Sequence, residues 1–216
     1  MEKPALLRQM WRRLLHIGPE AARPLGGAAW ASVWEPGERL LEHLERLPAG
    51  LLALWLHTDR GHILIGAGPS RYVAGPYIWR ERSYTGMCLL DSADIAGGTA
   101  ADAGAVPMWA ALLAWCDHLL GSLGEPDGVR FSAGAGATPR LQQAATRLQQ
   151  AIALGYAADL LGNSDAQGYL TGVWQLYLTT PTRLNATDPL SYRLLHDSLM
   201  DEAWWELVWR EVVQRT

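Results

Sequence analysis

An apolar pattern at helical spacing near the C-terminus constrains the fold of this 216-residue chain more than any other feature. Asp188 followed by Pro189 is typical of a helix start, and Leu, Val and Trp residues then recur every three or four positions as far as Gln214. The pattern predicts one amphipathic helix about 40 Å long, because each helical residue adds about 1.5 Å. Such a helix must bury a wide apolar stripe, so it requires a large surface to pack against.

Trp205 lies in this stripe, and Trp204 and Trp209 widen it. Successive residues of a helix point about 100° apart, so burying Trp204 and Trp205 together requires neighbours on more than one side. We therefore expect a protein partner or a second copy of the chain to cover them, which makes all three candidate interaction residues. The alternative is that helices expected over 108–123 and 138–154 cover the stripe, which would make the three tryptophans part of the core.

The N-terminal half has the signals of a sheet. Residues 51–57 and 62–66 are apolar runs on either side of the turn sequence Thr58-Asp59-Arg60-Gly61, which predicts a hairpin. Further strands are expected over 71–79, which Gly75-Pro76 interrupts, and over 84–90. The other expected elements are helices over 4–16, 35–47, 108–123, 139–154 and 169–179, and short strands over 28–34 and 129–132.

These elements predict an α+β fold, in which an antiparallel β-meander of three to five strands packs with a helical, mainly C-terminal half. The length fits one domain over 1–216, with sub-lobes over 1–100 and 101–216 as a further interpretation. The stretch 92–107 is rich in Ala, Gly and Asp, and we expect it to be a loop or a boundary between the two sub-lobes.

Composition excludes several classes of protein. With 49% hydrophobic and 19% charged residues the chain is globular, and its net charge of -4 gives no overall attraction to nucleic acid or anionic lipid. Cys88 and Cys116 lie in apolar surroundings, which favours free thiols in a reducing compartment. We see no signal peptide, and the longest apolar run, 108–116, is too short to span a bilayer. A cytoplasmic location is therefore expected.

Two short motifs could bind an ion. Across the predicted hairpin, His57 and His62 would lie about 5 Å apart, and with Asp59 they could bind zinc or another divalent ion. The alternative is that the two histidines flank a solvated turn. The second motif, 131–140, contains Gly134 and Gly136 before a helix that Thr138 would cap.

Backbone N–H groups at that helix start could bind an anion, with Arg140 adding positive charge. The loop lacks the residues of a Walker A or a dinucleotide-binding motif, so a plain turn before a capped helix is the competing interpretation. A third candidate surface is the basic N-terminal helix, where Arg8, Arg12 and Arg13 accompany Trp11 and could contact nucleic-acid phosphates or lipid headgroups. The alternative is an ordinary surface helix that packs through Leu7, Met10 and Leu14.

No catalytic or cofactor motif is recognisable, so no cofactor is expected. The first hypothesis is a non-catalytic interaction protein or accessory subunit that acts through its Trp-rich C-terminal helix, with a protein partner or as a homo-oligomer. The second is a small-molecule or nucleotide-binding enzyme that uses the loop from Gly134 to Arg140. The third is a nucleic-acid-associated module that uses the basic N-terminal helix.

Overall fold

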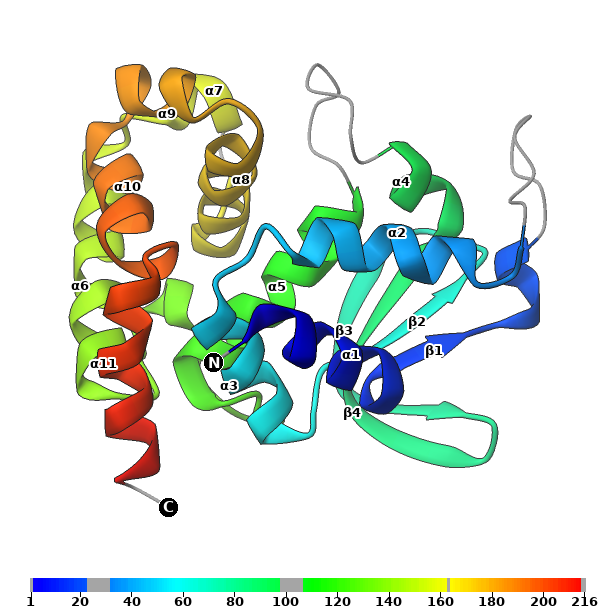
Figure 1. The fold of residues 1–216 in the computed structure, drawn as a ribbon. Helices are drawn as coiled ribbons and strands as arrows, with labels where there is room; N and C mark the ends of the chain where they lie inside the picture. Colours follow the sequence, from blue (N-terminus) through cyan, green and yellow to red (C-terminus); the bar gives the residue numbers. More distant parts are fainter. Residues whose placement is uncertain (1, 23–31, 98–106, 163, 215–216) are drawn as a thin grey trace.

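The structure, a computed structural model, describes residues 2–22, 32–97, 107–162 and 164–214 (Figure 1). The α-helices are α1 Lys3–Arg13, α2 Glu35–Leu44, α3 Ala49–Thr58, α4 Ser92–Gly97, α5 Pro107–Ser122, α6 Pro139–Leu154, α7 Ala158–Leu161, α8 Ala166–Thr179, α9 Pro181–Thr187, α10 Pro189–Leu194 and α11 Glu202–Val213. The strands are β1 Leu15–Ile17, β2 His62–Gly66, β3 Arg71–Trp79 and β4 Arg82–Asp91. Two 3₁₀ turns, η1 Pro19–Ala22 and η2 Phe131–Ala133, and one π-helical turn, η3 Leu195–Leu199, complete the described elements.

The four strands form one mixed sheet in the order β1-β2-β4-β3. β2 pairs in parallel with both β1 and β4, and only β3 and β4 are antiparallel. The chain is therefore a mixed α and β protein, as predicted, but the predicted antiparallel meander is not confirmed. The reason lies before β2, where the segment expected to be its hairpin partner is not a strand.

Residues 51–57 belong to helix α3, so the strand predicted there is wrong. Every residue from Ala49 to Leu56 is buried, and an apolar run without alternation suits a helix buried on all sides as well as a buried strand. The turn predicted at Thr58-Asp59-Arg60-Gly61 does follow this segment. Asp59 ends α3 in the left-handed conformation, with φ of 52°, and the chain then enters β2.

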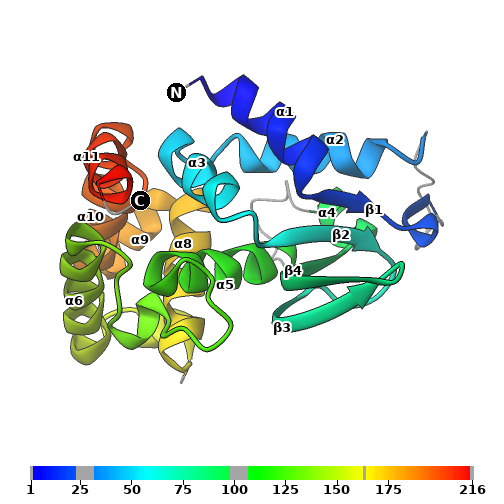
Figure 2. The same cartoon turned by 90° about the horizontal axis from the view of Figure 1, so that it is seen from below.

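Helices cover one face of the sheet. Alternate residues of β2 and β4, namely Ile63, Ile65, Cys88 and Leu90, belong to the hydrophobic core. Figure 2 shows α1, α2 and α3 together on one side of the sheet, and α5 packs against β3 and β4. The core continues into the C-terminal helices, so sheet and helical half share one cluster of buried side chains.

The C-terminal segment is not the single helix that the sequence predicted. α10 continues into the π-helical turn η3, which ends at Met200. A new helix, α11, then begins with Asp201 as its N-cap. The Asp201 carboxylate accepts a hydrogen bond from the Trp204 N–H, at 2.5 Å. Asp favours the N-cap over the interior of a helix, so Asp201 was a local signal for a new helix start, which the regular apolar spacing on both sides concealed.

Three shorter segments also differ from their predicted structure or lie partly outside the described residues. The strand expected over 129–132 is wrong, because Phe131–Ala133 is a 3₁₀ turn. The loop expected over 92–107 begins instead with helix α4, and 98–106 lie outside the described residues. Most of the strand expected over 28–34 also lies outside them. Among the helices that the structure describes, none has the length and apolar character needed to cross a bilayer.

Candidate functional site

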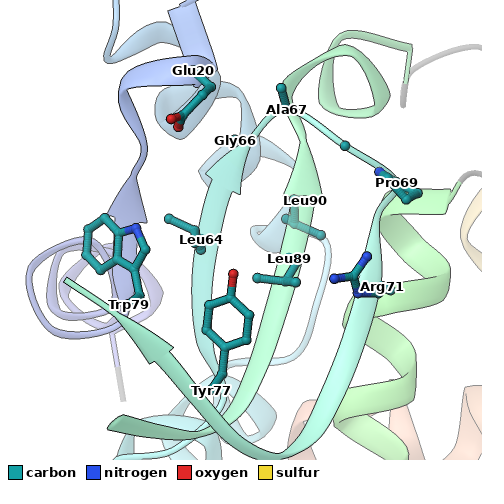
Figure 3. A pocket seen from close by; sticks show the side chains of 11 residues that line it. Glu20, Leu64, Gly66, Ala67, Pro69, Arg71, Tyr77, Trp79, Leu89 and Leu90 are labelled. Atoms are coloured by element: carbon teal, nitrogen blue, oxygen red, sulfur yellow. The ribbon is translucent and has the colours of Figure 1, made fainter. Parts of the chain in front are cut away.

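The face of the sheet opposite the helices carries a cavity of about 300 Å³ (Figure 3). Its floor consists of the side chains of Leu64 from β2 and Leu89 from β4, and the neighbouring residue Leu90, whose side chain belongs to the core, also borders it. Leu64 pairs with Leu89 in the parallel register, so both side chains point to the same face. Among the residues that the structure describes, none that belongs to an α-helix lines this cavity, which sets the face apart from the helix-covered one.

The hairpin of β3 and β4 forms the wall of the cavity. β1 and β3 are at opposite edges of the sheet, yet the ring centroids of Trp79 in β3 and His16 in β1 are only 5.1 Å apart. The end of the hairpin, where Trp79 pairs with Arg82 of β4, must therefore bend back over β2 to reach β1. A register shift between Val73 and Pro76 supplies the bend, because such irregularities curve a strand pair. The bend places Tyr77 and Trp79 beside the floor.

Two histidines form a neutral pair next to Trp79. His16 Nε2 and His62 Nδ1 are 3.2 Å apart, and the Tyr84 ring packs on both imidazoles. Burial, His62 and the guanidinium groups of Arg80 and Arg82 lower the pKa of His16 to about 4. Burial also lowers the pKa of His62, against the raising effect of a nearby carboxylate. The two rings therefore share a hydrogen bond as neutral groups at pH 7.

Charged groups stand at the margins of the cavity. Arg71, at the start of β3, and Glu20, in η1, both line it, and Figure 3 shows them on different sides of the floor. Among the described residues neither side chain belongs to an ion pair within 4.0 Å. The loop over 66–69 joins β2 to β3 along the same rim. The cavity thus combines an apolar floor, an aromatic wall and one charge of each sign.

A separate group of polar side chains is buried between α5, β3 and η2. The Asp117 carboxylate accepts hydrogen bonds from Ser132 N, at 2.6 Å, and from Ser132 Oγ, at 2.8 Å. His118 Nε2 is 2.6 Å from the carbonyl oxygen of Glu125, so Nε2 carries the proton and Nδ1 accepts from the Tyr72 hydroxyl at 2.7 Å. Burial raises the pKa of Asp117 and of Tyr72, and lowers that of His118.

These buried groups satisfy one another, and each bond joins two elements of the fold. The Ser132 bonds hold η2 against α5, and the Tyr72 bond holds β3 against α5. None of these side chains is among the described residues that line the cavity on the sheet. Their arrangement is that of a structural network. The sequence offered little to find it, because the partners are separated by up to 46 residues.

The residues of the predicted metal site do not come together as expected. His57 lies on α3 and packs edge-on against Trp209, with ring centroids 5.7 Å apart, whereas His62 is in β2. Asp59 forms an ion pair with Arg13 at 2.8 Å. The cross-strand geometry that motivated the site is missing because α3 is a helix. Within the described ranges no three His, Cys, Asp or Glu residues form a group that could hold a metal ion.

The predicted anion site at the start of α6 contains a carboxylate of the chain itself. Thr138 caps the helix as predicted, by accepting from Leu141 N. Glu211 of α11 accepts from the Arg140 backbone N–H at 3.0 Å and pairs with the Arg140 side chain at 3.1 Å. Gln142 holds both glycines, accepting from Gly136 N and donating to the Gly134 carbonyl.

The interaction residues predicted on the terminal helix have partners within the chain. Trp205 is only 1% exposed and packs against Gly50 of α3, while Trp204 and Trp209 are half-buried. Glu202 of α11 accepts from the Ala49 N–H at the start of α3, at 2.9 Å. The chain's own α3 and α6 therefore cover much of the stripe. A protein partner or a homo-oligomer stays a prediction.

The basic N-terminal helix forms as predicted, and Arg8 and Arg12 are exposed on α1. Its apolar face packs inward through Leu7 and Met10. Both cysteines are buried free thiols, as expected from their apolar surroundings. Burial raises the pKa of each thiol, so neither is a reactive nucleophile at neutral pH.

None of the residues predicted to bind an ion or a partner lines the cavity on the sheet. A weak signal for it was present, because Tyr77 and Trp79 alternate along one strand and Gly75-Pro76 marks a bend. The sequence did not reveal that the end of β3 folds back over the sheet and brings Trp79 to His16 of β1.

Comparison with known proteins adds no family to this description: no family model, no curated protein and no solved structure matches the chain.

Proposed function

We propose that this chain is a small-molecule-binding accessory protein whose ligand occupies the cavity on the helix-free face of the sheet. The sequence predicted a non-catalytic protein-interaction or accessory subunit that acts through its terminal helix. The proposal retains the non-catalytic role, but it replaces the protein partner with a small ligand and the terminal helix with the sheet. The observation that carries it is the return of the hairpin, which brings Trp79 within 5.1 Å of His16 and gives the open face a wall.

The size and lining of the cavity support a small ligand. A volume near 300 Å³ is at the lower end of the range of sites that hold small molecules. The lining combines apolar and aromatic side chains with charged and backbone groups, so both an apolar body and polar ends of a ligand would find partners there. The cavity also adjoins Gly66, where the parallel strand β2 ends, and ligands of open sheets commonly bind at that end of the strands.

The arrangement of the nearby imidazoles favours binding over catalysis. A general base must present a free nitrogen to the substrate within hydrogen-bond distance. His16 Nε2 and His62 Nδ1 instead face each other at 3.2 Å, the His16 ring packs on Trp79, and neither histidine is among the described residues that line the cavity. Their contribution is to hold the hairpin over the sheet.

A screen of small organic fragments by ligand-observed NMR tests the proposal. Fragments that bind with Kd below about 1 mM should lose binding in Trp79→Ala, which removes the wall, and in Leu89→Trp, which fills the floor. Ile78→Ala is the matched control, because Ile78 is on the same hairpin but is 75% exposed on its outer side. Circular dichroism would confirm that each variant is folded. The proposal fails if no fragment binds, or if binding is indifferent to both cavity substitutions.

A further inference from the structure

The cavity on the sheet has a positive group at one side and a negative group at another. Arg71 stands beside Leu89, its partner in the antiparallel pair of β3 and β4. Glu20 is in η1, beyond β2, because the N–H of Gly18 donates to the Ile65 carbonyl at 2.8 Å and so docks the start of η1 against β2. Figure 3 shows the two side chains apart, with the apolar floor between them.

The strand register sets the separation. Arg71 is in register with Leu89, and Leu89 is in register with Leu64, so two strand spacings, about 10 Å, separate the backbones of Arg71 and Leu64. Glu20 lies on the far side of Leu64. The two charged groups therefore border the floor on different sides, and a ligand that contacts both must extend across Leu64 and Leu89.

The chemistry of each group defines what it can bind. A guanidinium binds a carboxylate through two parallel hydrogen bonds, and a carboxylate such as Glu20 binds an ammonium or another donor. Both groups lack an ion-pair partner among the described residues. Between them Tyr77 and Trp79 offer aromatic surface to a flat apolar body. Glu20 also repels a ligand with several negative charges, such as a polyphosphate.

We infer that the ligand is a small bipolar molecule: a flat apolar body with a carboxylate at the end that meets Arg71 and an ammonium at the end that meets Glu20. This inference rests on the proposed function of the cavity. It goes beyond it by assigning Arg71 and Glu20 as the residues that determine specificity.

Three probes of one shape test the inference. 4-(Aminomethyl)benzoate carries both charges across a ring, 4-methylbenzoate carries only the carboxylate, and 4-methylbenzylamine carries only the ammonium. Calorimetric or NMR titration at pH 7.5 should give the bipolar probe a Kd about five- to tenfold lower than either single-charge probe, the gain expected of one additional hydrogen bond or ion pair that is partly exposed to solvent.

Substitution of the two charged residues then separates the contacts. Arg71→Gln should weaken 4-(aminomethyl)benzoate and 4-methylbenzoate about five- to tenfold and leave 4-methylbenzylamine unchanged. Glu20→Gln should weaken the two amines and leave 4-methylbenzoate unchanged. Arg71 is exposed and Glu20 is half-exposed, so both variants should fold. Arg147→Gln, an exposed substitution on α6 far along the chain, serves as the control.

These experiments also distinguish failure of the bipolar-ligand inference from failure of the proposed small-molecule binding in the cavity. If the three probes bind equally, or if Arg71→Gln and Glu20→Gln change all three alike, the bipolar ligand is wrong. The binding cavity would still stand if Trp79→Ala abolished that binding. If no probe binds and the fragment screen finds no ligand of the cavity, both the inference and the proposed function are wrong.

Discussion

Trp205 decides whether the terminal helix is part of the core or an interface, and its replacement by Ala is the most informative single change. The side chain is 1% exposed, and its Nε1 donates to the Leu199 carbonyl at 3.0 Å. Removing a buried aromatic side chain costs about 3–5 kcal/mol. That is a large share of the roughly 5–15 kcal/mol by which a domain is stable.

The packing of Trp205 against α3 explains why the cavity left by Ala would not collapse. An added Cβ on Gly50 would lie 2.3 Å from the Cβ of Trp205, so the two helices are already as close as their backbones allow. Trp205→Phe keeps most of the apolar contact and loses the indole hydrogen bond, so it should cost only about 1–2 kcal/mol.

Urea unfolding followed by far-ultraviolet circular dichroism measures both costs, and light scattering on the same samples gives the oligomeric state. We expect the order wild type, Trp205→Phe, Trp205→Ala in falling stability, with no change in mass. A cost below about 1 kcal/mol for Trp205→Ala, together with loss of a dimer, would refute the intramolecular packing and restore the interface prediction. If Trp205→Ala does not fold, the Phe variant still measures the contribution.

Three further predictions concern other contacts. The free energy of unfolding should fall as the pH drops from about 6.5 towards 4, because His16 and His62 have lowered pKa values in the folded chain and bind protons only after unfolding. Urea unfolding at several pH values measures this dependence, which should be weaker in a His16→Asn variant. Glu211→Gln should lower the thermal midpoint by a few degrees, since a neutral amide interacts less strongly with the start of α6, and equal midpoints would contradict that docking. Gly61→Ala should destabilise by more than about 2 kcal/mol in the same assay, because Gly61 has φ of 69° and an added Cβ would meet the Trp115 ring at 2.1 Å; a smaller loss would show that α5 can move away.

Local sequence signals predicted those elements whose conformation depends on residues close together in the chain. Thr138 and Pro139 marked the start of α6, and the capping bond from Leu141 N to the Thr138 hydroxyl is formed. The strands β2, β3 and β4, the helices α1, α2, α5 and α8, and the burial of both cysteines were likewise predicted from periodicity and composition. These features depend on residues a few positions apart, which a sequence displays directly.

The candidate site depends on contacts that no local pattern contains. His16 and His62 are 46 residues apart, and the strand β1 that carries His16 is only three residues long. The turn after α3 was visible, but whether its flanks were strands or a helix depended on how many sides of 51–57 would be buried. Burial is a property of the assembled core, so it was not available from the segment alone.

For the terminal segment, the sequence by itself determined an apolar stripe, a helix start after Asp188 and the need to bury Trp205. Only the tertiary structure decided what buries it: Glu202 docks α11 on the start of α3, and Glu211 docks it on the start of α6. The physical reason is that a hydrophobic stripe is non-directional and any apolar surface can satisfy it, whereas a carboxylate at a helix N-terminus selects one particular neighbour.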